Sequence, residues 1–356
     1  MPAISEFLQY CTKKSTRQAY TSALCSYLRI TLGLSVTKEN LDELWNIYLF
    51  SGRNIMHDLQ LFPEKCKNHN LSPKTINLYF QVTLLYLREC GLASDEAQLR
   101  RLKKIRPKNR PITREAELTR EIIRTILVHA DVRQRAEILI AASSGMRIGE
   151  ILRITFDDIN LTASPEEIYI PSHITKNETS RTVFISKEAA VALREWIFVR
   201  NGPHMLKGKE PAADNRIFPY SVTNETAKLN RLLQASGTYR IDPQTRRSLI
   251  HFHSFRKFFL TEFKLAASAE VAEELAGHTG YLSGSYRRLS KRDMQEEYRK
   301  AEMRLTIGEN TGETTSDQIT DIHEEMQRIT NQLKQIRTEY QLLRTRISNE
   351  SLLPEE

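Results

Sequence analysis

SSGMRIGEIL, at residues 143–152, lies near the middle of this 356-residue chain and places Arg147 three residues before Glu150. On a helix, side chains three residues apart share a face, so the Glu150 carboxylate can hold the Arg147 guanidinium in place. An arginine is suited to a phosphate, because its planar fork donates two parallel hydrogen bonds and keeps its charge. By itself such a pair is most often an ion pair on a helix surface, so its meaning depends on the motifs that accompany it.

Three further motifs follow this stretch in order. The sequence HSFR contains His253 and Arg256, the dipeptide Gly277-His278 comes next, and Tyr286 lies eight residues after that histidine. Together with the first arginine they provide two guanidiniums that can hold a phosphate, two imidazoles that can transfer protons and a phenol that can attack. Such a set would exchange phosphodiester bonds without a metal.

The first part of the chain, residues 1–99, is expected to form a helical domain. Apolar side chains recur at helical spacing after Ser15, which opens a capping-box sequence, and after Ser72-Pro73, which combines a cap with a proline at the first helical position. Strand-like alternation is missing from these residues, so we expect helices only.

Residues 113–307 are expected to form a second domain in which helices are mixed with short strands. The stretches 168–170 and 182–185 are rich in β-branched and aromatic residues and flank a polar turn that contains Lys176. They predict a hairpin. The fold class is therefore mainly α with a small β-sheet, an α+β arrangement behind a helical N-terminal domain.

A basic segment, residues 100–112, separates the two expected domains. Basic residues dominate it and two prolines interrupt it, which is typical of a linker, and the usual alternative is a solvated run of charge. In a basic protein a strap across a phosphate backbone is an equally good interpretation. The residues expected to contact a DNA backbone are Arg100, Arg101, Lys103, Lys104, Arg106, Lys108 and Arg110.

The composition favours a polyanionic partner and a reducing compartment. The formal net charge is +8, although a basic protein without any nucleic-acid role would also fit. The four cysteines all lie in the first quarter and form no CxxC pair. No apolar run approaches the ~20 residues that span a bilayer, and no signal peptide is recognisable. We expect a cytoplasmic protein without a membrane association.

The C-terminal residues have their own pattern. A polar linker over 308–317 precedes residues 318–349, in which apolar side chains from Ile319 to Ile347 alternate in steps of three and four. This spacing is typical of a coiled coil, and isoleucines at d positions favour oligomers larger than a dimer. The alternative is a single amphipathic helix packed on the protein's own surface.

At this point the chain resembles the tyrosine recombinase (phage integrase) family. The resemblance rests on MRIGEIL, on Lys176 before Arg181 in KNETSRTVFI, on HSFR, on Gly277-His278 and on the tyrosine that follows. The GSYRRL and EEYRKAE segments look most like archaeal members. Residues 1–99 are similar to the core-binding domain of this family and residues 113–307 to its catalytic domain.

The resemblance implies a role for each reactive group. Tyr286 would attack the scissile phosphate and leave a 3′-phosphotyrosine and a free 5′-hydroxyl, so rejoining would need neither ATP nor a metal. Arg147 and Arg256 would neutralise the non-bridging oxygens. His253 would assist deprotonation or bind the phosphate, and Lys176 would protonate the leaving 5′-oxygen.

Two further roles and three alternatives complete the site. His278 would support the phosphate, and Glu150 would orient the first arginine. The gap between this histidine and Tyr286 is about one residue shorter than is usual in the family, so Tyr281 and Tyr298 are rival nucleophiles. His251 is a rival to the histidine of HSFR, although it is misplaced relative to the arginine.

No metal or cofactor is expected. The acidic pair Asp157-Asp158 lacks the further carboxylates of a two-metal nuclease, and the chain has no HExxH, P-loop or dinucleotide motif. The predicted function is site-specific recombination of double-stranded DNA by a homo-tetramer, as in an integrase of a mobile element. The alternatives are a catalytically silent DNA-binding or assembly protein of the same fold, and a type IB topoisomerase or hairpin-end resolvase.

The C-terminal pattern can be tested directly. Deleting residues 308–356 should lower the oligomeric mass measured by light scattering, because the heptads would be the contact between chains. An unchanged mass would show that this segment does not join the copies.

Overall fold

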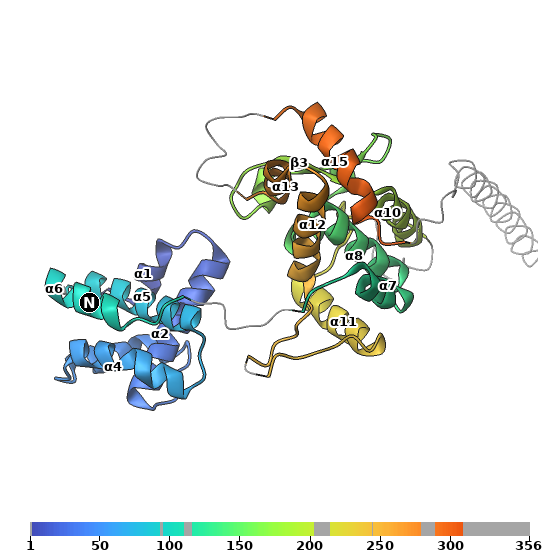
Figure 1. Cartoon of the computed structure of the whole chain (residues 1–356). Coiled ribbons are helices and arrows are strands. Elements are labelled where there is room, and N and C mark those ends of the chain that lie inside the picture. Colours follow the sequence, from blue (N-terminus) through green and yellow to red (C-terminus); the bar gives the residue numbers. More distant parts are fainter. Residues whose placement is uncertain are drawn as a thin grey trace, which may run out of the picture. The chain divides into compact units, whose positions relative to one another are not determined.

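The computed structural model describes residues 2–92, 95–109, 116–202, 214–243, 245–278 and 289–308. By compactness the chain divides into two units (Figure 1), which are described separately. The first holds Met1–Leu118 with Thr226–Ser254, and the second holds Thr119–Glu225 with the described residues from Phe255 onward. Within the described ranges, no helix is both long and apolar enough to cross a bilayer.

The N-terminal part of the first unit is helical, as the sequence predicts. Its helices are α1 (Ile4–Gln9), α2 (Lys14–Leu32), α3 (Leu41–Phe50), α4 (Ile55–Asn68), α5 (Pro73–Glu89) and α6 (Glu96–Ile105). Ser72 caps α5 as expected, since its side chain accepts a hydrogen bond from the Thr75 amide at 3.1 Å. The cap expected at Ser15 is wrong: α2 already begins at Lys14, so this serine lies inside its first turn.

An aromatic cluster forms the core of these helices. Tyr27 stacks on Trp45 with ring centroids 5.5 Å apart, and its hydroxyl lies 2.9 Å from that of Tyr48. The Tyr48 hydroxyl donates in turn to the buried Asp58 carboxylate, which Arg53 neutralises. The Tyr27, Tyr48 and Asp58 oxygens are thus hydrogen-bonded, whereas the buried Trp45 Nε1 has no partner among the described residues. All four cysteines of the sequence are free and buried.

The basic segment begins as a helix. Residues 100–105 belong to α6, and the buried Leu102 packs on the aromatic core. Arg106 then donates to Asn77 at 3.0 Å and to Gln81 at 3.1 Å, and its guanidinium lies over the Phe80 ring. These contacts fix the start of the segment on α5.

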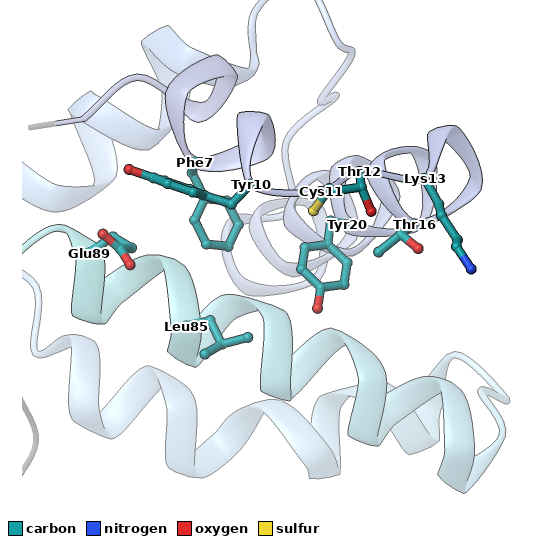
Figure 2. A pocket seen from close by; sticks show the side chains of 9 residues that line it. All are labelled: Phe7, Tyr10, Cys11, Thr12, Lys13, Thr16, Tyr20, Leu85 and Glu89. Carbon is teal, nitrogen blue, oxygen red and sulfur yellow. The ribbon is translucent and has the colours of Figure 1, made fainter. Parts of the chain in front are cut away.

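A groove of about 360 Å³ opens between α1, α2 and α5 (Figure 2). Its walls combine aromatic and aliphatic side chains with a cysteine, two threonines, one lysine and one glutamate. The lining residues are Phe7, Tyr10, Cys11, Thr12, Lys13, Thr16, Tyr20, Leu85 and Glu89. None of the residues predicted to carry chemistry lies in this groove.

The other elements lie in the second unit or reach into it. They are α7 (Arg120–Val128), α8 (Val132–Ser144), α9 (Ile148–Ile151), β1 (Ile159–Asn160), β2 (Glu166–Ile170), β3 (Arg181–Ile185), α10 (Lys187–Arg200), α11 (Val222–Ala235), α12 (Phe252–Ala266), α13 (Ala269–Ala276) and α15 (Lys291–Leu305), with short 3₁₀ turns η1 (Phe156–Asp158) and η2 (Ser172–Ile174). The strands form an antiparallel sheet in the order β1-β2-β3. The predicted hairpin and the mainly helical fold class are confirmed.

Helix α8 is the centre of the second unit. Its residues Ile138–Ala142 are almost completely buried, and α9, α10, α15 and β3 all contact it. Because so many elements pack around α8, the turn at its C-terminal end is held firmly in place. That turn carries the SSGMR sequence.

A cluster of buried charges lies at the other end of α8. The side chains of Glu137, Glu225 and Arg133 are 1, 1 and 7% exposed, and Arg133 lies 3.7 and 3.5 Å from the two carboxylates. The Arg133 guanidinium also covers the Tyr220 ring at 4.4 Å. Two acids share one base, so burial and the charge of Glu225 raise the pKa of Glu137 to about 9.

This pKa makes stability depend on pH. Between about pH 4.5 and 9 the native Glu137 binds a proton that the unfolded chain has lost, so the free energy of unfolding should fall as pH rises, by at most ~1.4 kcal/mol per pH unit. We expect Glu137→Gln to unfold at a higher temperature at pH 8 and to flatten this slope. Thermal unfolding from pH 5 to 9 measures this pH dependence of stability, with the substitution of an exposed glutamate, Glu195→Gln, as control. Equal slopes in Glu137→Gln and wild type would contradict the buried proton.

Candidate active site

The turn after α8 begins the site. Gly145 ends the helix with φ +66°, and a Cβ at this position would lie 2.3 Å from a Phe259 ring carbon, so only glycine allows α12 to approach. The Ser144 hydroxyl accepts from the Met146 amide at 3.2 Å. Met146 itself is buried. Packing on both sides of the turn therefore fixes the backbone that leads into Arg147.

Arg147 and Glu150 interact as the sequence predicts. The Arg147 Nη1 donates to Glu150 Oε1 at 3.0 Å, and the Arg147 backbone amide donates to Oε2 at 3.0 Å. The Glu150 side chain is 2% exposed and the Arg147 side chain 30%. The carboxylate is thus the buried partner, and part of the guanidinium remains accessible.

A second arginine, Arg181, shares this carboxylate and was not predicted as a site residue. Its Nη2 donates to Glu150 Oε2 at 2.7 Å, and its Nε donates to the Leu275 carbonyl at 2.8 Å. Burial alone would raise the pKa of Glu150, but the hydrogen bonds and charge of Arg181 hold it below its ordinary value. The available signal was an arginine at the head of the otherwise apolar strand RTVFI.

Arg256 is the most buried arginine of the site. It is 1% exposed, and its Nη1 donates to the Gly145 carbonyl. Its Nε and Nη2 have no hydrogen-bond partner among the described residues. Burial first, and then the charge of Arg147, lower the pKa of Arg256 to about 10. A buried cation with two unsatisfied N–H groups beside a second arginine is suited to an anion.

The predicted lysine and the HSFR histidine lie on the surface of their elements. Lys176 is exposed in the turn between β2 and β3. His253 is exposed on the first turn of α12, three residues before Arg256. His251, its rival, precedes the helix, and its amide and ring nitrogen contact the Ser254 hydroxyl at 3.1 and 3.0 Å.

His278 follows directly after α13 and pairs with an acid. Its Nδ1 contacts Glu273 Oε2, and Lys264 contacts the other oxygen of the same carboxylate. The hydrogen bond from Lys264 and the contact with His278 lower the pKa of Glu273. Glu273 can therefore orient the His278 ring and leave Nε2 toward solvent or substrate, a contact that sequence spacing did not indicate.

Of the three candidate tyrosines, only Tyr298 lies within the described residues; Tyr286 and Tyr281 lie outside them. Tyr298 is completely buried, its hydroxyl donates to the Ser143 carbonyl at 2.9 Å, and its ring packs against Phe184 and Phe263. Burial raises its pKa well above the ordinary value. Tyr298 is a packing residue at the back of the SSGMR turn.

The basic residues expected at a DNA backbone have different environments. Five of them are exposed, namely Arg100, Arg101, Lys103, Lys104 and Lys108, and are accessible to a polyanion. Arg106 is already engaged by α5, and Arg110 lies outside the described residues.

The acidic pair at 157–158 serves the turn that contains it. Asp158 accepts from both the amide and the hydroxyl of Thr155 at 2.8 Å, and Asp157 accepts from Asn215 at 2.6 Å. Within the described ranges, no group of three histidine, cysteine or acidic side chains is placed to hold a metal ion.

The sequence is similar to a known family and to known proteins. Residues 115–305 match the model of the phage integrase family. The tyrosine recombinase XerA of Pyrococcus horikoshii is 23% identical over 254 residues, which cover 70% of this chain and 81% of that protein. The tyrosine recombinase XerD of Corynebacterium glutamicum is 29% identical over 183 residues, 50% of this chain and 56% of that protein.

Solved structures agree on the fold. The Tn1549 transposon integrase, in complex with transposon right end DNA, has a TM-score of 0.54 at 14% identity and covers 83% of this chain and 97% of that one. A lambda integrase dimer bound to a COC′ core site has a TM-score of 0.51 at 16% identity, covering 81% and 97%. Since the family model spans more than half of the sequence and contains Arg147, Arg181, Arg256 and His278, the chain belongs to the phage integrase family of tyrosine recombinases.

Proposed function

We propose that the protein is a site-specific DNA recombinase that cuts and rejoins strands through a 3′-phosphotyrosyl intermediate. The observation that carries this proposal is the buried Arg256 guanidinium, which has two N–H groups without a partner among the described residues and lies within the field of Arg147. One non-bridging phosphate oxygen pair would satisfy both arginines. Such preorganised donors stabilise charge that develops in a transition state.

The reaction balances with the groups at hand. The Tyr286 hydroxyl loses its proton and attacks phosphorus, a P–O bond to tyrosine forms, and the P–O5′ bond breaks. A phenol with pKa about 10 is mostly protonated at neutral pH, so His253 would accept or share its proton. Lys176 would protonate the leaving 5′-oxygen, and His278 would donate to a phosphate oxygen. The energy of the broken bond is retained in the phosphotyrosine, so reversal with a new 5′-hydroxyl rejoins the strand without ATP.

The exposed basic side chains of α6 and Lys108 support double-stranded DNA as the partner, because they can release counterions from a phosphate backbone. The structural neighbours bound to transposon-end and core-site DNA support the same partner. We assign the core-binding role to residues 1–99 and catalysis to residues 113–307. Exchange of four strands would suit a tetramer in the cytoplasm, and the heptads of residues 318–349, which lie outside the described residues, would help to hold it.

The nucleophile can be tested with a matched control. Tyr286→Phe should form no covalent protein–DNA adduct on a nicked suicide substrate, because it lacks the attacking oxygen. Tyr298→Phe should form the adduct normally but unfold more easily, by about 1–3 kcal/mol, since the Ser143 carbonyl loses its donor. Denaturing gels measure the adduct and urea titration the stability. An adduct in Tyr286→Phe would show that another residue attacks.

The anion site can be tested at Arg256. Arg256→Lys keeps the charge but loses the planar fork, so the rate of adduct formation should fall roughly 100- to 1,000-fold while DNA affinity changes little. Arg200→Lys is the control, because Arg200 is also buried in the second unit and its partners among the described residues are Asn201 and the carbonyls of Asp214 and Arg216. Single-turnover cleavage and gel-shift titration separate the two effects. A normal rate in Arg256→Lys would remove this arginine from the phosphate site.

A further inference from the structure

We propose that Arg181 is a positioning residue of the recombination site. Its side chain joins Glu150, the Lys176 hairpin and the Gly277–His278 turn, and its charge offsets that of Glu150. This inference rests on the proposed function and adds to it a residue that does not touch the substrate. Three sets of contacts support it.

The first set joins Arg181 to the carboxylate that holds Arg147. Arg181 donates to Glu150 Oε2 at 2.7 Å and to Oε1 at 3.4 Å, while Arg147 donates to Oε1 with its side chain and to Oε2 with its amide, both at 3.0 Å. Each carboxylate oxygen thus accepts from both arginines. Because Glu150 is 2% exposed and Arg181 8%, water cannot replace either donor.

The second set joins Arg181 to the turn that presents His278. Its Nε donates to the carbonyl of Leu275, in the last turn of α13. The guanidinium also lies directly against Gly277, where a Cβ would come within 2.9 Å of Cζ and Nη1. Gly277 has φ +69°, so glycine permits both the turn and the close approach. His278 is the next residue, and its backbone path depends on this contact.

The third set joins Arg181 to the lysine hairpin. Arg181 is the first residue of β3, five residues after Lys176, and pairs with Ile170 at the end of β2. The turn between the strands carries Lys176. Arg181, at the start of the second strand, therefore fixes that end of the turn to Glu150 and α13. A single buried guanidinium thereby ties together three segments that are distant in the sequence.

The charge of Arg181 also has a consequence for the anion. Arg147, Arg181 and Arg256 against Glu150 sum to 3 − 1 = +2, and without Arg181 the sum is 2 − 1 = +1. A phosphodiester carries one negative charge, but the five-coordinate transition state carries two. Loss of Arg181 should therefore slow bond breaking much more than it weakens DNA binding, because only the transition state needs the second charge.

A matched control exists elsewhere in the same unit. The Arg133 side chain is 7% exposed and pairs with the buried Glu137 and Glu225, as Arg181 pairs with Glu150. Arg133→Met should destabilise the fold as Arg181→Met does, since each substitution removes a buried base from a buried carboxylate. Only Arg181→Met should disturb the site.

The experiment compares wild type, Arg181→Met, Arg181→Lys and Arg133→Met in the full-length protein. Adduct formation is followed in single turnover on a nicked suicide substrate at saturating protein, and DNA affinity by gel shift. We expect Arg181→Met to slow the adduct roughly 100-fold with little change in affinity, and Arg133→Met to leave the rate near wild type. Arg181→Lys retains the charge without the fork and should recover only part of the rate.

A second readout does not depend on cleavage. Amide hydrogen exchange should accelerate in residues 145–152 and 271–278 in Arg181→Met, and to a lesser extent in Arg181→Lys, but not in Arg133→Met. If wild type forms no adduct, the proposed function fails, but the amide hydrogen exchange rates still test whether Arg181 holds the two segments in place. Exchange in both segments that matches the Arg133→Met control would overturn the proposal, as would an Arg181→Met rate equal to that of the control. If Arg181→Met does not fold, the adduct rate and hydrogen exchange of Arg181→Lys are compared with those of Arg133→Met instead, and equality in either would overturn the proposal.

Discussion

One buried carboxylate, Glu150, determines how the arginines of this site are arranged. Its two oxygens accept four hydrogen bonds, from the side chain and amide of Arg147 and from both terminal nitrogens of Arg181. Removing charges from water is expensive unless they are paired and hydrogen-bonded, and this carboxylate meets both conditions. Among the described residues Arg256 has no carboxylate partner, and its Nη1 donates to the carbonyl of Gly145. The charge that remains unbalanced is therefore concentrated on the arginine that is buried deepest.

The charge clusters at the two ends of α8 both contain unequal numbers of acids and bases, with an excess of acid at one end and of base at the other. At the N-terminal end two acids share Arg133, and the excess of acid raises the pKa of Glu137 to about 9. Past the C-terminal end Arg147 and Arg181 share Glu150, and burial together with the charge of Arg147 lowers the pKa of Arg256 to about 10. The first cluster relieves its excess by holding a proton. The second can relieve its excess only by binding an anion, because an arginine stays protonated at neutral pH.

Sequence alone predicted the elements but not the contacts that join them. The hairpin around Lys176, the helix that carries His253 and Arg256 and the pairing of Arg147 with Glu150 all follow from local spacing, and the structure contains each of them. The position of Arg181 could not be predicted this way, since its partners lie 31 and 94 residues away. Local signals also misplaced the start of α2, because packing of Tyr27 and its neighbours, rather than the Ser15 cap, fixes that helix.

Contacts between distant residues also determine the structure of the basic segment, which local sequence signals did not predict. Charge density and prolines suggested an interdomain linker, and they gave no sign that residues 100–105 are helical with Leu102 buried on the aromatic core. Arg106 is then held by Asn77 and Gln81, and Asn77 also donates to the Pro107 carbonyl and to Asn109 Oδ1, so contacts with α5 continue to Asn109. A single apolar position in a basic run thus decides which side chains pack and which stay exposed.

The candidate site residues fall into a buried group and an exposed group. Arg256 and Arg181 are buried and fixed by carbonyls and a carboxylate, whereas Lys176, His253 and His278 are exposed. Groups that stabilise charge act best when they are rigid and shielded from water, since their dipoles then need no reorganisation during the reaction. Groups that transfer protons must instead reach the atoms that change protonation and exchange with solvent afterwards. In the proposed reaction, the packing around α8 would therefore hold the first kind of group, and turns and helix ends would supply the second kind.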